Sequence, residues 1–422
     1  MLDERWRAIA AAHARETALH DAATGRRWTF AELRAAADAD LLPRDEGPVF
    51  PGGHGIEFIL AVLRGWRSRR VVCPLEPGQP APVLPPPPPG IAHLKLTSGT
   101  TGAAKCVAFT AAQLAADADA IVPTMGLRPD WPNLGVISLA HSYGFSNLVL
   151  PLLLHGIPLV LVPTPLPAAL LAAARASGYA AFTLAAVPAM WRAWHEAAAI
   201  PPGVRLAISA GAPLPLALEA AVFAAHGLKL HNFLGASECG GIACDMGATP
   251  RPDASFVGHP LHGVKLVRSA EGCLEVTGPS VGETYWPQPN DTLHAGRYRT
   301  RDLVEFAADG GAFLRGRADD VINVAGRKVT PEAIELVLRQ HAGVRECLVL
   351  GVPSDEQRGE AVAAVIEADP SLTATALREF ALNRLPAWQV PRVWRFVNSL
   401  TPNGRGKLSR AEWRANLVND KS

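Results

Sequence analysis

The sequence predicts an α/β fold with a mostly parallel sheet, a small β-rich subdomain and a C-terminal α+β unit. In the first half of the chain, short apolar runs typical of buried strands alternate with Ala-rich helical segments. From Gly258 to Phe313, short apolar runs are separated by Gly and Pro turns, which favours a β-rich subdomain. The tail from Asp320 is about a hundred residues, enough for a compact unit, and Thr330 and Pro331 are typical of a helix start.

The expected elements follow the apolar runs in order along the chain. We expect helices at residues 32–40 and 58–67 and a strand at residues 71–73. Five consecutive prolines at residues 85–89 lack backbone donors and predict a stiff connector. The further strands are expected at residues 91–96, 135–139, 157–162, 181–184, 206–209 and 229–233.

Composition and charge disfavour several classes of protein. A length of 422 residues allows two to three domains, and 49% hydrophobic residues support large cores. With 40 basic and 39 acidic residues the net charge is +1, which disfavours nucleic acid as a partner. The longest apolar stretch, residues 148–162, is interrupted by prolines and predicts a buried strand or helix, not a membrane span. The first residues lack the apolar core of a signal peptide, so we expect a cytoplasmic protein.

The cysteines give no sign of a metal site or a disulfide framework. Six are scattered along the chain, and only Cys239 and Cys244 lie close together. A zinc site would need a second pair at zinc spacing, which the sequence lacks. We therefore expect reduced thiols.

Residues 96–105 combine small, hydroxyl-bearing and basic residues directly after an expected strand. Glycines let backbone N–H groups turn toward an anion, hydroxyls add donors and lysine adds a positive charge, which favours a phosphate-binding loop. The segment is not a Walker A loop, because Ala104 stands where that pattern requires glycine. The alternative is a Ser/Thr/Gly-rich turn between strands. The residues predicted to bind phosphate are Thr97, Ser98, Gly99, Thr100, Thr101, Gly102 and Lys105.

Further polar clusters follow downstream in a fixed order. Gly-Ala-Ser-Glu occupies residues 235–238, Tyr-Arg-Thr-Arg-Asp residues 298–302, Gly-Arg-Ala-Asp-Asp residues 316–320 and Pro-Asn-Gly-Arg-Gly-Lys residues 402–407. Together with the loop at residues 96–105, they resemble the adenylate-forming superfamily of acyl- and aryl-CoA ligases, peptide-synthetase adenylation domains and beetle luciferases. The resemblance extends from about Trp28 to Arg410, nearly the whole chain.

The resemblance implies two domains. An adenylation core would comprise residues 1–318, with the β-rich subdomain at about residues 258–316, and a mobile lid would comprise residues 319–422. Asp319 matches the hinge about which the lid of this family turns between two half-reactions. The alternative is a charged surface turn, since glycine and aspartate favour turns in any protein.

The resemblance also implies a first half-reaction, in which a substrate carboxylate attacks the α-phosphorus of ATP and pyrophosphate leaves. Glu238 matches the Mg²⁺ ligand, and Ser237 keeps a hydroxyl for the α-phosphate. Lys407 would reach in from the lid and bridge the carboxylate and the α-phosphate. The alternative for Lys407 is a solvated lysine of the tail.

For the adenosine, the resemblance assigns Asp302 to the ribose hydroxyls and Arg317 to the support of that carboxylate. Asn232 would read the adenine amino group. The sequence departs from the family pattern at Leu234, where an aromatic residue is common, and at Arg301, where glycine is usual. The other residues assigned to the nucleotide are Gly211, Ala212, Pro213, Phe233, Leu234 and Gly235.

The resemblance implies that the acid substrate lies near the block at residues 140–146, where peptide-synthetase domains normally keep an aspartate for the substrate ammonium. The block contains no carboxylate to pair with the ammonium of an amino acid, and an unpaired ammonium in an apolar pocket is costly, so amino acids are disfavoured. His141 and Gly144 resemble the pattern of acyl- and aryl-CoA ligases, with a core histidine as the alternative for His141. We expect Gly240 and Gly241 to leave a channel for an acyl chain. The pocket is expected to contain Tyr143, Gly144, Phe145, Val187, Gly211, Leu234, Gly235, Gly240 and Gly241.

In the second half-reaction, a thiol would attack the acyl-adenylate. Gly326 resembles the glycine beside the pantetheine tunnel. The thiol would be coenzyme A or a carrier-protein phosphopantetheine. We expect no extra carrier domain after Ser422 and therefore favour coenzyme A. A non-catalytic nucleotide- or acyl-binding relative is the remaining alternative, although it would not need Lys407. The protein is expected to be a monomer or a homodimer.

Overall fold

The computed structural model describes residues 1–40, 42, 47–96, 105–354, 359–400 and 409–419. Within them, the chain forms two compact units. The first comprises Met1–Val267, Glu275–Thr300 and Phe306–Ala312. The second comprises Arg268–Leu274, Arg301–Glu305 and Phe313–Ser422. Asp319 lies in the second unit, and its role as a hinge stays a prediction.

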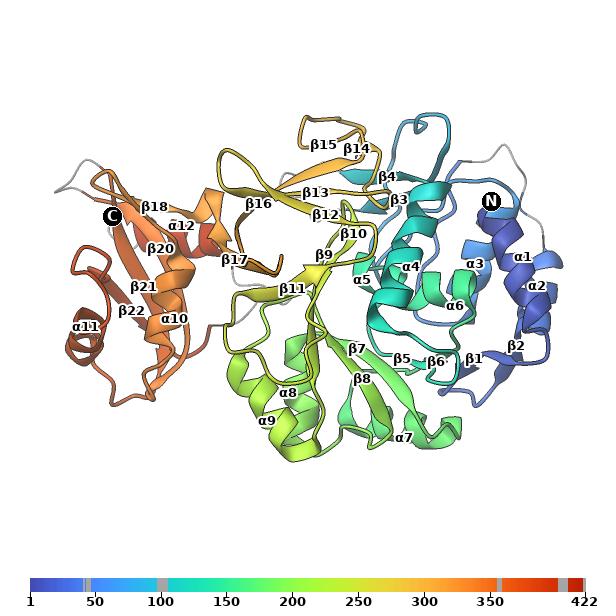
Figure 1. Cartoon of the computed structure of the whole chain (residues 1–422), viewed down its shortest axis with the longest axis horizontal. Coiled ribbons are helices and arrows are strands. Elements are labelled where there is room, and N and C mark those ends of the chain that lie inside the picture. The colour runs from blue at the N-terminus through green and yellow to red at the C-terminus, as the bar shows by residue number, and fades with distance from the viewer. Residues whose placement is uncertain (41, 43–46, 97–104, 355–358, 401–408, 420–422) are drawn as a thin grey trace. The chain divides into compact units, whose positions relative to one another are not determined.

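A large mixed sheet forms the centre of the first unit (Figure 1). Its strands run in the order β11-β10-β9-β8-β7-β5-β6-β1-β2, and the pairs from β9 through β8, β7, β5 and β6 to β1 are all parallel. The pairs of β9 with β10, β10 with β11 and β1 with β2 are antiparallel. The strands are β1 (Thr17–Asp21), β2 (Arg27–Thr29), β5 (Asn133–Gly135), β6 (Leu159–Leu161), β7 (Phe182–Ala186), β8 (Val204–Ser209), β9 (Leu230–Ala236), β10 (Gly240–Cys244) and β11 (Phe256–Pro260).

Further strands of the chain pair antiparallel in smaller groups. β3 (Ile91–Leu96), β4 (Cys106–Thr110) and β14 (Thr284–Trp286) form a separate small sheet in the order β14-β4-β3. β15 (Leu293–His294) pairs antiparallel with the first residues of the ten-residue strand β16 (Arg297–Phe306). Besides β14, β15 and β16, the region predicted to be β-rich contains β12 (Lys265–Arg268), β13 (Cys273–Thr277) and β17 (Ala312–Arg317).

Helices cover the sheet of the first unit. Capping boxes begin two of them: Thr29 and Glu32 exchange bonds at the start of α2, and Thr110 and Gln113 do so at α4. Figure 1 shows α8 and α9 beside the strands β7 and β8. The helices are α1 (Leu2–Ala12), α2 (Phe30–Asp38), α3 (Ile56–Arg67), α4 (Ala111–Met125), α5 (Ser142–Gly144), the π-helix η1 (Phe145–Val149), α6 (Leu150–His155), α7 (Pro167–Ser177), α8 (Pro188–Glu196) and α9 (Leu216–His226).

The second unit is an α+β structure, as the sequence predicts. β20 (Val344–Pro353) and β21 (Glu360–Ala368) pair antiparallel, and β22 (Val393–Val397) joins them in parallel. The 3-10 helix η2 spans Ala318–Asp320. The hydrophobic core of the second unit includes Ile334, Leu338, Val349, Ile366 and Leu377. The other elements are the hairpin strands β18 (Ile322–Val324) and β19 (Arg327–Val329) and the helices α10 (Pro331–Leu338), α11 (Ala374–Leu382) and α12 (Arg410–Asn419).

The α/β fold class is confirmed, but two expected strands are wrong in detail. Instead of a strand at residues 71–73, Val72 alone makes isolated bridges, to Val49 and His93. The strand expected at residues 135–139 is β5, which ends at Gly135. It ends there because the chain turns at Ser138, whose hydroxyl accepts the N–H of Ala140 at 3.3 Å.

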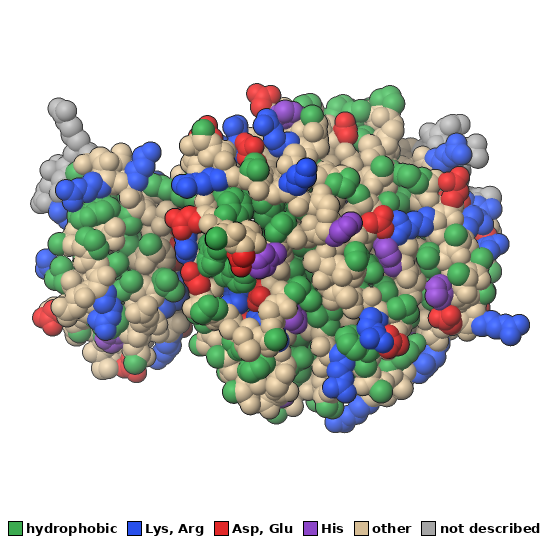
Figure 2. Space-filling model, in the orientation of Figure 1, with side chains coloured by type: hydrophobic (Ala, Val, Ile, Leu, Met, Phe, Trp, Pro, Cys, Tyr) green, Lys and Arg blue, Asp and Glu red, His purple; other side chains and the backbone are tan. Residues whose placement is uncertain are grey.

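The surface carries both signs of charge. On the face shown in Figure 2, basic and acidic side chains lie interspersed, in keeping with the net charge of +1. In the described part of the chain, no helix is long and apolar enough to span a membrane.

Candidate functional site

A tight hairpin between β9 and β10 carries two of the predicted site residues, Ser237 and Glu238. Its three-residue turn, residues 237–239, is followed by Gly240, whose φ of +69° is the left-handed conformation that such turns require. The Cys239 N–H donates to the Ala236 carbonyl at 3.3 Å and closes the turn. The Gly282 N–H donates to the Glu238 carbonyl at 2.8 Å, so the backbone of the turn is held from outside the hairpin as well.

The Glu238 carboxylate lies beside a tyrosine that the sequence analysis missed. The Tyr285 hydroxyl donates to Glu238 Oε1 at 2.8 Å. The ammonium of Lys105 lies 3.7 Å from the centre of the Tyr285 ring. Burial and the neighbouring Glu238 both raise the pKa of Tyr285, so it stays a neutral donor. The structure therefore brings Glu238, at the hydroxyl, and Lys105, over the ring, to the same aromatic residue.

The predicted adenine residues lie at the carboxyl end of β8 and on the neighbouring strand β9. Ser209 pairs in register with Asn232, so the turn that begins at Ala210 starts next to that amide. Asn232 Nδ2 donates to the Phe256 carbonyl at 3.1 Å, which leaves Oδ1 as the atom that would accept from an amino group. Gly211 has a φ of +85°, and a Cβ there would lie 3.3 Å from Val187. The structure brings these residues together, and their role toward adenine stays a prediction.

A buried charge network supports this region, and the sequence analysis did not find it. Lys229 forms ion pairs with Glu219 and, at 2.7 Å, with Asp245, and Arg251 binds Glu219 at 2.9 Å. All four side chains are buried. Arg251 also donates to the carbonyls of Phe256 and Leu214, each at 2.8 Å. The network thus holds the carbonyl that Asn232 binds and the residue that follows Pro213.

The block at residues 140–146, predicted to contact the acid substrate, begins with a local cap. His141 Nδ1 accepts the Tyr143 N–H at 3.2 Å. A Cβ at Gly144 would overlap the Ser138 carbonyl, so only glycine fits there. Phe145 is fully buried and packs on His93, with ring centres 4.4 Å apart.

Tyr143 lies across the carboxyl ends of the parallel strands. Its ring stacks on Phe233 with centres 6.0 Å apart and an angle of 26°. Its hydroxyl is 3.5 Å from the carbonyls of Ala186 on β7 and Ile208 on β8. Burial raises the pKa of Tyr143, so the side chain stays neutral. The carboxyl ends of parallel strands are where α/β proteins bind their ligands.

The channel that we expected beside Gly240 and Gly241 is filled by side chains. A Cβ at Gly240 would overlap the Asp117 carboxylate, and one at Gly241 would overlap Leu261 and lie 3.2 Å from Ile121. The expectation of a channel at these glycines is therefore wrong. Glycine is needed here because β10 packs closely on α4, not because a chain passes through.

In the second unit, Asp302 and Arg317 lie in contact, and their roles toward the ribose stay predictions. Arg317 Nη1 lies 3.3 Å from Asp302 Oδ1. Arg301, the departure from the family pattern, pairs with Asp319 at 3.6 Å, so a charged contact ties the residue before Asp302 to the predicted hinge. Gly326 forms the turn of the β18–β19 hairpin with a φ of +86°, and nothing described lies within 4 Å of where its Cβ would be.

Other predicted residues lie outside the described part of the chain, so their roles remain predictions. They are Thr97, Ser98, Gly99, Thr100, Thr101, Gly102 and Lys407.

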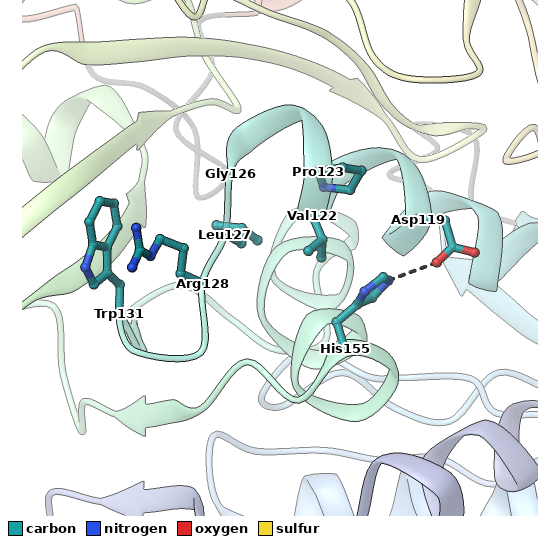
Figure 3. A pocket seen from close by; sticks show the side chains of 8 residues that line it. All are labelled: Asp119, Val122, Pro123, Gly126, Leu127, Arg128, Trp131 and His155. Atoms are coloured by element: carbon teal, nitrogen blue, oxygen red, sulfur yellow. Dashed lines mark ion pairs between the residues drawn. The ribbon is translucent and has the colours of Figure 1, made fainter. Parts of the chain in front are cut away.

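A surface hollow of the first unit has no connection with these residues. It is lined by α4, the segment after it and the end of α6 (Figure 3). Its charged groups are already paired: Asp119 with Arg5 at 2.6 Å and His155 at 2.9 Å, and Arg128 with Asp130 at 2.8 Å. We assign no ligand to it.

Comparison with known proteins identifies the family. The sequence profile of the AMP-binding enzymes matches residues 56–286, and that of the AMP-binding enzyme C-terminal domain matches residues 333–407. The chain belongs to the AMP-binding enzyme family. The resemblance to the adenylate-forming superfamily is thereby confirmed.

Relatives of this AMP-binding enzyme include several named ligases. It is 30% identical over 334 residues to a probable 2-succinylbenzoate–CoA ligase of Mycobacterium tuberculosis, covering 76% of this chain and 83% of that protein. It is 33% identical over 237 residues to the fatty acid–[acyl-carrier-protein] ligase ScoC of Streptomyces coeruleorubidus, covering 51% and 45%. The fold matches ATP-bound MatB from Rhodopseudomonas palustris with a TM-score of 0.83 at 20% identity, over 100% of both chains.

Proposed function

We propose that this protein is an ATP-dependent, AMP-forming acid–thiol ligase. It adenylates a hydrophobic carboxylic acid, fatty or aryl, releases pyrophosphate and transfers the acyl group to coenzyme A. The observation that carries the proposal is the Glu238–Tyr285–Lys105 arrangement, which combines a carboxylate for a cation with an ammonium for phosphate on one hairpin and its neighbouring sheet. Membership of the AMP-binding enzymes supports it.

Adenylation brings two anions together, so the chain must neutralise phosphate oxygens and align the attacking carboxylate. Lys105 would bind phosphate oxygens, and Lys407 would bridge the carboxylate and the α-phosphate. Asp302, held by Arg317, would accept the ribose hydroxyls. Asn232 Oδ1 would accept the adenine amino group.

Magnesium fits the hairpin. Mg²⁺ is commonly held by one or two carboxylates together with substrate phosphates and waters, and Glu238 supplies one. The Tyr285 hydroxyl occupies Oε1 and fixes the carboxylate. Among the described residues, no group of three or more His, Cys, Asp or Glu side chains forms a protein-only metal site, so the nucleotide would complete the coordination. The bound ion would offset phosphate charge.

Coenzyme A is the proposed acceptor because of the relatives' names and the open side of Gly326. Proteins named as CoA ligases dominate the relatives, whereas ScoC is named for a carrier protein. The open space on the Cβ side of Gly326 is what a thiol arm passing close to the backbone would need.

The proposal is tested by pyrophosphate release with ATP and Mg²⁺ over a panel of fatty, aryl and amino acids, with and without coenzyme A. We expect release with one hydrophobic class and a CoA-dependent rise in AMP. Release that coenzyme A does not affect would instead indicate a carrier protein as acceptor. Nucleotide binding without release for any acid would favour a non-catalytic relative and contradict the proposal.

Replacement of Asp302 is expected to weaken nucleotide binding. The Asp302→Ala variant loses the acceptor for both ribose hydroxyls and leaves Arg317 without this carboxylate, so the affinity for ATP should fall about tenfold or more. Calorimetry of ATP binding measures it. Glu305→Ala, which removes a carboxylate paired with Arg315 from the same strand, β16, is the control and should bind as the wild type does. Equal affinities in all three proteins would rule out the ribose role.

Replacement of Tyr143 is expected to broaden the choice of acid. The ring lies on Phe233 and across the ends of β7 and β8, so Tyr143→Ala should admit longer or bulkier acids and raise their kcat/KM relative to compact ones about tenfold. The measurement is kcat/KM across a series of acids of increasing chain length. Tyr179→Ala, a half-buried tyrosine that follows α7, serves as the control. An unchanged profile would exclude Tyr143 from the acid pocket.

A further inference from the structure

A buried lysine, serine and aspartate form a hydrogen-bonded chain in the first unit. Lys95 is on β3, Asp117 on α4 and Ser146 on η1, and the Lys95 and Asp117 side chains are 4% and 2% exposed. Lys95 Nζ lies 3.3 Å from Ser146 Oγ and 3.8 Å from Asp117 Oδ2. The Ser146 hydroxyl donates to the same Oδ2 at 2.5 Å. Asp117 Oδ2 therefore accepts the hydrogen bond of the hydroxyl and lies within ion-pair distance of the ammonium.

The other oxygen of Asp117 holds the candidate hairpin. Asp117 Oδ1 accepts the Gly241 N–H at 3.0 Å. The same carboxylate lies against Gly240, in the space that a Cβ would occupy. Gly240 is the left-handed residue that closes the turn carrying Ser237 and Glu238. The carboxylate therefore fixes the exit of that turn, while the Gly282 N–H fixes its tip.

Lys95 connects this clamp to the strand that leads into the predicted phosphate loop. Lys95 is on β3 and precedes Thr97 by two positions in the sequence. The ammonium also lies 4.6 Å from the centre of the Phe109 ring on β4, the strand that begins directly after Lys105. The chain Lys95–Ser146–Asp117 thus links the strands on both sides of residues 97–105 to the hairpin of Glu238.

A buried ion pair is a poor source of stability, because desolvation of the two charges offsets much of their attraction. Its directional bonds, however, permit one arrangement of the groups that they join. A purely apolar contact between α4 and β10 would bury the same surface without orienting the Gly241 N–H.

We propose that Lys95, Ser146 and Asp117 are positioning residues of the adenylation step. They hold the Ser237–Glu238 turn at a fixed position relative to β3 and β4, the strands that flank the predicted phosphate loop. They act through the backbone of Gly240 and Gly241 and do not touch the substrate. The inference rests on the proposed function, since it assigns the turn to nucleotide and Mg²⁺.

The test compares Asp117→Ala with the double variant Lys95→Met/Asp117→Ala. The single variant leaves a buried ammonium without its carboxylate and should be unstable. The double variant removes both charges, so its melting temperature should lie above that of the single variant, but the clamp on Gly241 is absent. We expect half-saturation by MgATP to rise about tenfold in the double variant. Transfer from preformed acyl-adenylate to coenzyme A should keep its rate, and the amides of residues 236–241 should exchange hydrogen faster.

Asp119→Ala is the matched control, because it removes a paired carboxylate from the same helix at the hollow of Figure 3. It should keep the wild-type half-saturation and exchange. The inference would be overturned if the double variant kept the wild-type half-saturation by MgATP and the wild-type hydrogen exchange at residues 236–241. It would also be overturned if adenylation and transfer to coenzyme A were slowed equally. If the wild type releases no pyrophosphate with any acid, the proposed function fails. Magnesium-dependent ATP binding by calorimetry and the exchange at residues 236–241 would then still decide the role of Asp117.

Discussion

The Lys407→Ala variant should lose adenylate formation by a factor of about 10²–10³ or more while it still binds ATP. The attacking carboxylate and the α-phosphate are both anionic, and a cation between them lowers the energy of the transition state more than that of bound ATP. The role therefore predicts a fall in kcat for pyrophosphate release with little change in ATP affinity. Single-turnover formation of the acyl-adenylate is the measurement.

Two further variants make this result specific. Lys407→Arg keeps the charge on a larger, planar group and should recover only part of the rate, because arginine does not replace a compact ammonium. Lys265→Ala removes an exposed lysine on β12 and should leave the rate unchanged. Formation of acyl-adenylate at the wild-type rate by Lys407→Ala would show that another residue bridges the two anions.

The Lys229→Met variant should be destabilised by about 3–5 kcal/mol. Lys229 is the common partner of Glu219 and Asp245, and all three are buried, so its loss leaves two carboxylates with Arg251 as the remaining cation of the network. The urea midpoint of the first unit, followed by tryptophan fluorescence, would report the change. Trp191 and Trp194 lie buried on α8 in the same unit.

The double variant Lys229→Met/Asp245→Asn removes one charge of each sign and should regain part of the lost stability. The exposed Lys265→Met is the control for loss of a lysine. If Lys229→Met alone had the wild-type urea midpoint, the buried carboxylates of Glu219 and Asp245 would not need the Lys229 ammonium for stability. Because Arg251 holds the carbonyls of Phe256 and Leu214, the single variant should also bind ATP more weakly.

Much of the fold could be predicted because its elements are local. Strands such as β3 follow from runs of apolar residues, and the helices at α2 and α3 follow from helical spacing. Prediction was weakest where a side chain interrupts a run. β5 ends early because the Ser138 hydroxyl bonds to nearby backbone N–H groups, which the hydrophobic pattern does not register.

The candidate site divides in the same way. The order of the motifs along the chain predicts the roles of Glu238, Asn232, Asp302 and Arg317, and the structure adds the contact between Asp302 and Arg317. Tyr285 carried no sequence signal, because it lies in a Gly-, Pro- and Asn-containing segment and gains its role only through a bond to a residue 47 positions away.

The sequence by itself determined the family, the class of fold and the order of the polar clusters, since short-range patterns and motifs carry that information. Only the tertiary structure decided which side chains meet. It filled the space beside Gly240 and Gly241 with Asp117, Ile121 and Leu261, and it paired Lys95 with Asp117. The physical reason is that such contacts depend on how separate elements pack: Asp117 meets Gly241 across 124 positions, a distance over which no periodicity extends.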